Sequence, residues 1–223
     1  MSRTALHPVV NDWFASRFGG GFTAIQKRAL QHTLRGENTL ILAPTGSGKT
    51  LAAFLSVLSD LTRAAHAGKG LPNATRAVYV SPLKALGRDI YRNLELPLAA
   101  CNAALPPDRQ IRMAVRTGDT DPADRSRQKR HRPHLLLTTP ESLSAVLSQT
   151  GSRDSGFDVR TIVVDEIHSL AENKRGTLLA LTMERLEARA SAPLQRIGLS
   201  TTAWPIDAVT SLMCGDRPCA VHP

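Results

Sequence analysis

The chain has 223 residues, more than the usual single-domain size of about 100 to 200 residues but fewer than two full domains require. Its 42% apolar and 21% charged residues can build a buried core, which excludes a disordered chain, a collagen-like chain and a small disulfide scaffold. The 28 Lys and Arg exceed the 19 Asp and Glu, and the resulting net charge of +9 favours a polyanionic partner, whereas 4% aromatic residues argue against binding mainly by base stacking.

Short strands and longer helices are expected to alternate along the chain. Two amphipathic helices come first, over residues 7–18 and 23–35, separated by three glycines at 19–21. Buried strands are then expected over residues 39–43, 76–80, 111–115, 134–138, 161–164, 196–199 and 219–222. Helices are expected between them, over residues 51–66, 83–104, 141–149, 177–190 and 206–213. The alternation predicts βαβ crossovers, and hence one α/β domain with a doubly wound, mainly parallel sheet flanked by helices.

Three cysteines, Cys101, Cys214 and Cys219, are an odd number in a chain long enough to fold without disulfides. We therefore expect free thiols in a reducing compartment. No stretch reaches the roughly 18 apolar residues that a membrane span requires, and the N-terminus contains no apolar signal segment. A cytoplasmic protein without a membrane partner is expected.

A glycine-rich segment lies between an expected strand and an expected helix, which is the context of a phosphate-binding loop. Gly46 and Gly48 would let backbone N–H groups curl round the phosphates of a nucleotide, and the Lys49 ammonium would reach the same oxygens. The Thr50 hydroxyl is a candidate ligand of Mg²⁺. The complete segment is Ala43, Pro44, Thr45, Gly46, Ser47, Gly48, Lys49 and Thr50, with alanine where the generic pattern has glycine. The alternative interpretation is a glycine-rich turn without a ligand.

Two adjacent carboxylates, Asp165 and Glu166, follow another expected strand. They would lie at the carboxyl edge of the sheet, where α/β folds bind ligands. Asp165 would hold Mg²⁺ through its water shell, and Glu166 would orient and deprotonate an attacking water. Such a pair alone is often only a favourable charge at a helix N-terminus. The upstream loop favours the catalytic interpretation.

The loop and the sequence Asp165-Glu166-Ile167-His168 together resemble a superfamily 2 helicase, and the flanking segments resemble the large helicase-related (Lhr) family. The Lhr-like segments are residues 7–10, 13–14, 81–86, 116–120, 138–143 and 172–176, which extend over nearly the whole chain. The resemblance implies a RecA-like P-loop NTPase domain that uses ATP and Mg²⁺. It also implies 3′-to-5′ translocation on single-stranded DNA, unwinding of DNA or RNA–DNA duplexes, and a role in DNA repair.

The resemblance assigns further residues to the nucleotide site. Thr23 and Gln26 match an adenine-recognition motif, in which the Gln26 amide would pair with the purine edge; a surface glutamine is the alternative. His168 joins Lys49, Asp165 and Glu166 as a catalytic residue. Ser200 and Thr202 match the hydroxyls that couple hydrolysis to strand movement, whereas Thr201 stands where the family usually has alanine.

The resemblance also places a nucleic-acid strand along Lys84, Thr117, Gly118, Thr139 and Glu141. Contacts of this kind address phosphates and are independent of base sequence. Thr139 and Glu141 are equally consistent with a plain helix start. Two groups of basic residues have two possible interpretations, a solvated surface or a further DNA contact. One group is Lys174 with Arg175, next to a glycine turn at Gly176. The other is the basic cluster Arg125, Arg127, Lys129, Arg130 and Arg132.

Residues 1–223 are expected to form the first motor domain of a longer enzyme, with residues 1–36 as a helical adenine-recognition region. The second RecA-like domain, which would supply an arginine finger, is expected to be absent from this chain. Hydrolysis by the chain alone should then be nearly absent, because an arginine finger contributes about 10³ to 10⁵ in turnover. The alternatives are a non-catalytic nucleotide or nucleic-acid binding module, and the first domain of a Ski-like or restriction-type translocase.

Overall fold

The computed structural model describes residues 5–19, 21–82, 84–149, 156–171, 173–202 and 205–222, and over residues 84–88 it describes the backbone alone. Gly20, Leu83 and Glu172, which belong to the segments above, lie outside the described residues. Residues 150–155, which precede β5, also lie outside the described residues.

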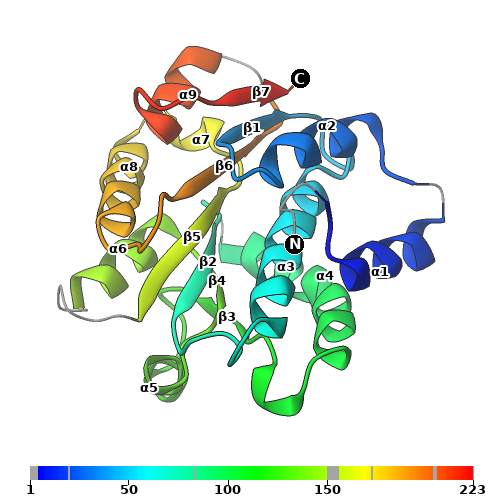
Figure 1. The fold of residues 1–223 in the computed structure, drawn as a ribbon. Helices are drawn as coiled ribbons and strands as arrows, with labels where there is room; N and C mark the ends of the chain where they lie inside the picture. Colours follow the sequence, from blue (N-terminus) through cyan, green and yellow to red (C-terminus); the bar gives the residue numbers. More distant parts are fainter. Residues whose placement is uncertain are drawn as a thin grey trace.

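The strands of the described residues form one seven-stranded sheet in the order β3-β4-β2-β5-β6-β1-β7 (Figure 1). Each neighbouring pair is parallel. The strands are β1 (Thr39–Leu42), β2 (Thr75–Val80), β3 (Met113–Arg116), β4 (Leu135–Thr138), β5 (Phe157–Val164), β6 (Gln195–Ser200) and β7 (Ala220–His222). All connections between them are therefore crossovers, as the expected fold class requires.

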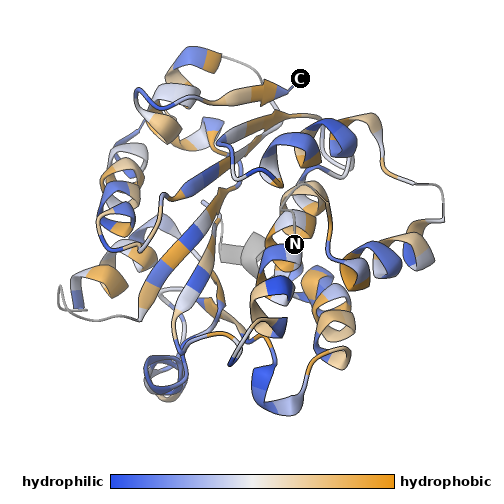
Figure 2. Ribbon diagram, viewed as in Figure 1, coloured by the Kyte–Doolittle hydropathy of each residue, from blue (hydrophilic) through white to orange (hydrophobic). Residues whose placement is uncertain are grey.

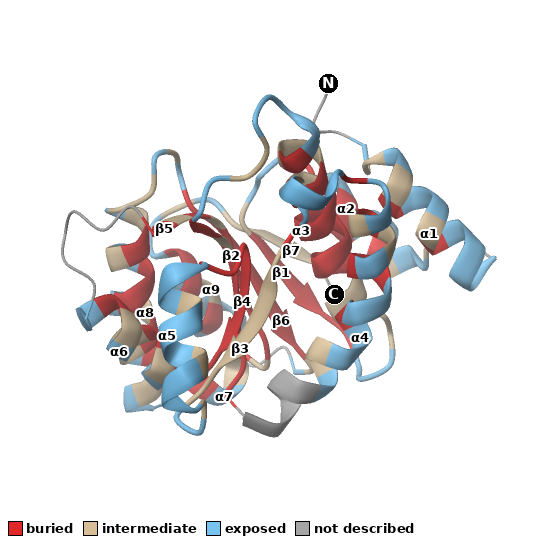
Figure 3. Ribbon diagram, turned by 90° about the horizontal axis from the view of Figure 1, so that it is seen from below, coloured by how far each residue is buried: buried red, intermediate tan, exposed pale blue. Residues whose placement is uncertain are grey.

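Helices cover both faces of this sheet (Figure 3). One face carries α1 (Pro8–Phe18), α2 (Ala24–Thr33), α3 (Lys49–His66) and α4 (Lys84–Ala103). The other carries α6 (Pro140–Gln149), α7 (His168–Ala171), α8 (Lys174–Glu187) and α9 (Ile206–Cys214). A 3₁₀ turn, η1 (Pro107–Arg109), precedes β3, and α5 (Pro122–Arg130) connects β3 to β4 on the side of α6.

The strands alternate their apolar side chains between two cores. Ile41 packs with α3 and its neighbours, whereas Leu40 and Leu42 of the same strand pack with α8 and α9. In β4, Leu137 and Leu136 divide in the same way. Because both faces are buried, the inner strands are largely apolar, and Figure 2 shows them mostly as orange and pale ribbon with blue segments in β5 and β6. The doubly wound fold expected from the sequence is confirmed.

Several expected boundaries are wrong, and two elements begin three or more residues earlier than expected. β5 begins at Phe157 rather than at residue 161, because Phe157 and Val159 are buried and Phe157 pairs with Thr75 of β2. α8 begins at Lys174 rather than at residue 177, since the Asn173 side chain caps the helix by accepting a hydrogen bond from the backbone N–H of Arg175. Gly176 is consequently helical and does not form the turn that the sequence suggested.

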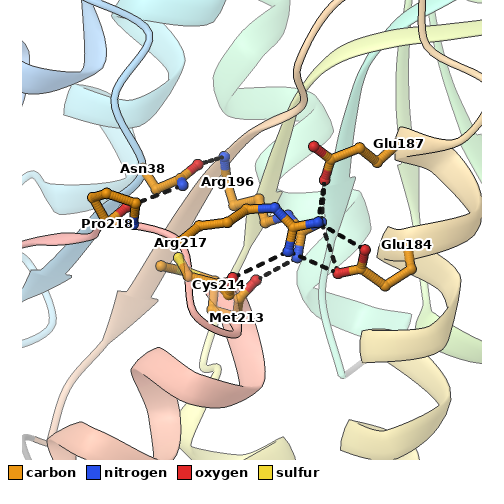
Figure 4. A network of polar contacts seen from close by, with 8 residues as sticks. All are labelled: Asn38, Glu184, Glu187, Arg196, Met213, Cys214, Arg217 and Pro218. Atoms are coloured by element: carbon orange, nitrogen blue, oxygen red, sulfur yellow. Dashed lines mark hydrogen bonds and ion pairs between the residues drawn. The ribbon is translucent and has the colours of Figure 1, made fainter.

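A buried arginine fixes the end of the sheet opposite the candidate site. Arg196 of β6 is 1% exposed and donates through Nη1 to the Met213 carbonyl, at 2.9 Å. Its Nη2 pairs with the carboxylates of Glu187 and Glu184, and Arg217 pairs with Glu184 at 2.8 Å (Figure 4). These contacts connect α8, β6 and the turn before β7, so the final strand is held against β1.

The three cysteine thiols are free, as expected. Cys101 and Cys214 are buried, and Cys219 is half-buried. Burial raises the pKa of the Cys101 thiol, which therefore stays protonated at neutral pH.

Candidate functional site

The glycine-rich loop connects β1 to α3, so its backbone N–H groups point beyond the carboxyl edge of the sheet. Gly46 and Gly48 have φ angles of 80° and 85°, in the left-handed region. Lys49 begins α3 and is 4% exposed, and its ammonium lies inside the loop, where Nζ donates to the Ala43 carbonyl at 3.1 Å. The Ser47 Oγ is buried without a protein partner. The loop thus has the form and the polar atoms of a phosphate site.

Gln26 packs directly behind this loop. It is 4% exposed, so the alternative of a surface glutamine is wrong. Its Oε1 accepts from the backbone N–H of Thr23 at 3.0 Å, while the Thr23 hydroxyl accepts from the N–H of Gln26 at 3.3 Å. Its Nε2 donates to the Gly48 carbonyl at 3.5 Å, and a Cβ added at Gly48 would lie 2.4 Å from that nitrogen. The left-handed φ angle of Gly48 therefore favours glycine, and any side chain there would displace the Gln26 amide.

Asp165 directly follows β5, in the middle of the sheet. It is 3% exposed; its Oδ1 accepts from the backbone N–H of Glu166 at 2.9 Å, and its Oδ2 accepts from the Tyr79 hydroxyl. Burial first, and then the charges of Asp165 and Glu166, raise the pKa of Tyr79 well above its usual value. Tyr79 therefore remains a neutral donor that orients the Asp165 carboxylate.

Glu166 has a φ of 46°, and among the described residues it is the one non-glycine in the left-handed region. Such a conformation costs on the order of 1–3 kcal/mol and persists where the surroundings impose it. The neighbouring backbone is tied on both sides, because the N–H of Asp165 donates to the Val80 carbonyl at 2.8 Å and the N–H of Ile167 donates to the Leu199 carbonyl at 3.1 Å. The strain turns the Glu166 side chain away from the path of β5.

Ser200 and Thr202, the residues expected to couple hydrolysis to strand movement, are connected to Glu166 through contacts with His168. His168 Nδ1 lies 2.9 Å from Ser200 Oγ and 3.5 Å from Glu166 Oε2. Ser200 Oγ in turn donates to the Thr202 carbonyl at 2.6 Å. The Thr201 hydroxyl also reaches Glu166, with 3.4 Å between Oγ1 and Oε2.

The loop and the acid pair line one cavity of about 470 Å³. Thr45, Gly46, Gly48, Lys49 and Thr50 are on one side of it, and Asp165 and Glu166 are on another. Pro44 is exposed at the start of the loop. The order β5-β6-β1 makes this possible, since the strands that carry the acid pair and the loop are separated by β6 alone.

The sequence did not predict the apolar wall of this cavity. Trp13, Arg17 and Phe18 of α1 and Leu96 of α4 line it, and Phe18 and Leu96 are large exposed apolar side chains. Trp13 belongs to an Lhr-like segment, but no signal in the sequence places Arg17 or Leu96 beside the loop, because α4 lies far along the chain.

The candidate nucleic-acid residues lie on the neighbouring part of the same sheet edge, after β3, β4 and β2. Thr117 and Gly118 form a turn in which the Thr117 N–H donates to the Thr120 Oγ1 at 2.9 Å. Thr139 is 4% exposed, and its hydroxyl accepts from the Ser142 N–H at 3.4 Å, so it caps α6. Glu141 is exposed in the first turn of α6, and Lys84 begins α4 with a side chain outside the described part of the chain.

A family model described as DEAD/DEAH box helicase matches residues 23–209. The chain belongs to this family. It is 47% identical, over 97% of its length, to the ATP-dependent helicase Lhr-Core of Methanothermobacter thermautotrophicus, of which it covers 26%. It is 41% identical, over 96% of its length, to the Lhr helicase/uracil glycosylase of Escherichia coli, of which it covers 14%.

Solved helicase structures agree with the fold. The Mycobacterium smegmatis helicase Lhr bound to ssDNA and AMP-PNP matches 98% of this chain and 28% of its own length, with a TM-score of 0.85 and 40% identity. The DEAD-box helicase Mss116 matches 97% of this chain and 43% of its own, with a TM-score of 0.82 at 19% identity, which supports the fold alone. The resemblance to Lhr helicases is therefore confirmed, and the chain spans about a quarter or less of the length of the curated relatives named above.

The basic cluster of this helicase domain divides into separate environments. α5 buries no side chain and is polar all round, as its blue ribbon in Figure 2 shows. Arg125 donates to the carbonyls of Thr120 and Gly118, both at 2.7 Å, and so supports the Thr117 turn. Arg132 is 8% exposed, with its guanidinium over the Phe157 ring. The remaining members are exposed: Arg127, which pairs with Asp124, and Lys129 and Arg130. Neither a uniform solvated face nor a uniform DNA contact describes the cluster.

No helix among the described residues combines the length and apolar composition needed to cross a bilayer.

Proposed function

We propose that this chain is the ATP-binding motor domain of an Lhr-like, ATP-dependent 3′-to-5′ translocase and helicase that acts on DNA or RNA–DNA duplexes in DNA repair. The observation that carries the proposal is the single cavity in which the phosphate-binding loop faces Asp165 and Glu166. A module that only binds a nucleotide has no need of a strained carboxylate at that place. The names of the Lhr relatives support the choice of helicase class.

ATP would bind with its phosphates in the loop. The N–H groups of Gly46, Ser47 and Gly48 and the Lys49 ammonium would contact the phosphate oxygens, and the buried Ser47 hydroxyl has an unused hydrogen-bonding capacity that suits the same ligand. Thr50 and Asp165 offer the hard oxygen donors that Mg²⁺ prefers. Bound Mg²⁺ would neutralise charge on the phosphates.

Chemistry would then depend on Glu166. Its carboxylate would orient a water and accept its proton, while the Tyr79 hydroxyl holds the Asp165 carboxylate in place. His168 would transmit changes at Glu166 to Ser200 and Thr202 through its 3.5 Å contact with Glu166 Oε2 and its hydrogen bond with Ser200.

The base of the nucleotide would lie in the wider part of the cavity. Trp13 and Phe18 offer apolar and aromatic surface there, and Arg17 offers a planar cation that can stack on a base. Thr23 and Gln26 belong to the same region through the Gly48 contact. In this conformation both amide atoms of Gln26 have protein partners, so pairing with adenine would require Gln26 to exchange one of them.

A nucleic-acid strand would follow the ends of β3, β4 and β2. The strand would pass the turn at Thr117 and Gly118 and the first turn of α6 at Glu141, which the buried Thr139 hydroxyl caps, and Lys84 would add a cation. Their order matches a continuous edge next to the nucleotide cavity. The ssDNA-bound M. smegmatis Lhr structure supports this partner. A second RecA-like domain would close over both sites and supply an arginine finger that stabilises charge on the transferred phosphoryl group.

The proposal is tested by turnover in a protein that contains both motor domains. Glu166→Gln should keep ATP and DNA binding and lower turnover by roughly 10² to 10⁴, the usual contribution of a positioned general base. Asp165→Asn should instead raise the Mg²⁺ concentration needed for half-maximal turnover. Normal turnover in Glu166→Gln would eliminate Glu166 as the base.

A further inference from the structure

Arg175, in the first turn of α8, bridges two segments that lie on the proposed nucleic-acid edge. Its Nε and Nη2 donate to Glu141 Oε1 and Oε2 at 2.5 and 3.3 Å. Nη2 also donates to the Pro82 carbonyl at 2.9 Å. One guanidinium therefore joins the start of α6, the turn after β2 and the start of α8, which come from three separate parts of the chain.

The backbone beneath Arg175 is itself held in place. Asn173 accepts from the Arg175 N–H at 2.9 Å and donates to the Ser169 carbonyl at 2.6 Å. Gly176 packs so closely on α7 that an added Cβ would lie 2.1 Å from the Leu170 carbonyl oxygen. The first turn of α8 thus packs on α7, which begins at His168, two residues after Glu166.

The charges argue against a direct phosphate contact by either side chain. A carboxylate at Glu141 would repel a phosphate, and the Arg175 guanidinium holds the pKa of this carboxyl below its usual value, so the charge persists. The guanidinium already directs donors to the two carboxylate oxygens and the Pro82 carbonyl. The side chains of Arg175 and Glu141 are 39% and 49% exposed. Exposed ion pairs contribute only about 0–1 kcal/mol to stability, so a gain in stability does not explain this arrangement. A bidentate pair of a guanidinium and a carboxylate does, however, fix the relative orientation of Arg175 and Glu141.

We propose that Arg175 is a positioning residue for the nucleic-acid strand: its paired bonds to Glu141 and its bond to Pro82 hold the start of α6 and the turn after β2 in register with the segment that follows Asp165 and Glu166. The inference rests on the proposed function, because it presupposes a strand on this edge. The proposal also gives Glu141 a different role: its backbone N–H would face the nucleic-acid strand, and its carboxylate accepts the hydrogen bonds of Arg175.

The test measures binding of a fluorescent oligothymidylate to the 223-residue chain by anisotropy. Glu141→Gln removes a negative charge, so electrostatics alone would tighten binding; the proposal predicts that binding weakens by about three- to tenfold, the range of moderate coupling energies. Arg175→Gln should weaken it equally, and the double variant should be no weaker than either single variant. Arg175→Lys should not restore binding, because an ammonium cannot bond both carboxylate oxygens and Pro82 in the planar geometry of a guanidinium.

The matched control is Lys174→Ala, which removes the exposed neighbouring cation. It should change affinity less than twofold. A residue that contacts a phosphate directly lowers the salt dependence of log affinity by about one unit when it is removed, whereas Arg175→Gln should leave that slope unchanged. Thermal unfolding of each variant verifies that it is folded.

The outcomes separate the inference from the proposed function. If the unmodified chain binds the strand but Glu141→Gln binds equally well or more tightly, the positioning role is overturned and the nucleic-acid edge is retained. If the unmodified chain shows no binding, both are overturned. Weaker binding in both single variants, with no further loss in the double variant, establishes the positioning role.

Discussion

Thr201 Oγ1 lies 3.4 Å from Glu166 Oε2, so the residue that departs from the usual alanine contacts the carboxylate proposed as general base. Glu166 Oε2 also lies 3.5 Å from His168 Nδ1. The hydroxyl therefore occupies one acceptor position of the group proposed to accept a proton from water.

Removing this hydroxyl should free the carboxylate. In a protein with both motor domains, we expect Thr201→Ala to raise kcat by up to about tenfold with little change in KM, since a long hydrogen bond contributes on the order of 1 kcal/mol and tenfold in rate corresponds to about 1.4 kcal/mol. Thr201→Ser keeps the hydroxyl and is the matched control, with kcat near that of the unmodified protein. Steady-state kinetics showing equal kcat in all three proteins would remove any influence of Thr201 on the base.

Because the members of the basic cluster lie in different environments, substituting them should change the affinity for a nucleic-acid strand to different extents. Arg125→Ala should weaken oligothymidylate binding because it releases the carbonyls of Gly118 and Thr120 from the turn that carries Thr117. It should leave the salt slope unchanged, since Arg125 serves the turn and not a phosphate. The double variant Lys129→Ala/Arg130→Ala removes two exposed charges and should leave affinity within twofold. Anisotropy titrations at several salt concentrations compare them, and a larger loss in the double variant would assign the contact to the exposed face.

His134 should make the fold sensitive to acid. Burial first, and then the charges of Arg112 and Arg76, lower the pKa of His134 from 6.5 to about 4. The folded state thus binds the proton less readily than the unfolded state, so the stabilisation is complete above pH 6.5 and is lost as the pH falls towards 4. The shift corresponds to about 3 kcal/mol at full protonation.

The variant His134→Asn isolates this effect, because the asparagine oxygen can accept the bond that His134 Nδ1 accepts from the Arg112 N–H at 3.1 Å. Urea unfolding at pH 7 and pH 4.5 should show a loss of free energy of unfolding that is smaller in the variant by about 2 kcal/mol. Identical losses would show that His134 titrates normally.

Much of the fold and of the nucleotide site follows from local sequence. Strand positions were predictable because both faces of the sheet are buried, which makes β1, β2 and β4 largely apolar. The loop at Gly46–Lys49 and the acid pair were predictable because their chemistry requires particular residue types next to a strand. The start of β5 at Phe157 was not, since its polar neighbours Asp158 and Arg160 alternate with buried residues and resemble a loop.

The contacts that organise the site come from tertiary structure and leave no local signal. Arg175 and Glu141 are 34 residues apart, and nothing in either segment indicates that they pair. Arg125 and Arg132 belong to one basic run in the sequence, yet Arg125 in α5 donates to the Gly118 carbonyl, whereas Arg132, which follows the helix, is buried. Thr201 was visible as a departure, but its contact with Glu166 depends on β6 lying beside β5.

The most direct test of the nucleotide site is calorimetric titration of the 223-residue chain with Mg²⁺ and AMP-PNP, compared with Lys49→Ala. Lys49 lies inside the loop, and its ammonium is the one cation that the loop places among the phosphates. Lys69→Ala, which removes an exposed lysine elsewhere, is the control, and circular dichroism verifies folding. We predict weak binding by the unmodified chain and by Lys69→Ala, and no detectable binding by Lys49→Ala. Equal affinity in all three proteins would contradict the assignment of this loop as the ATP site.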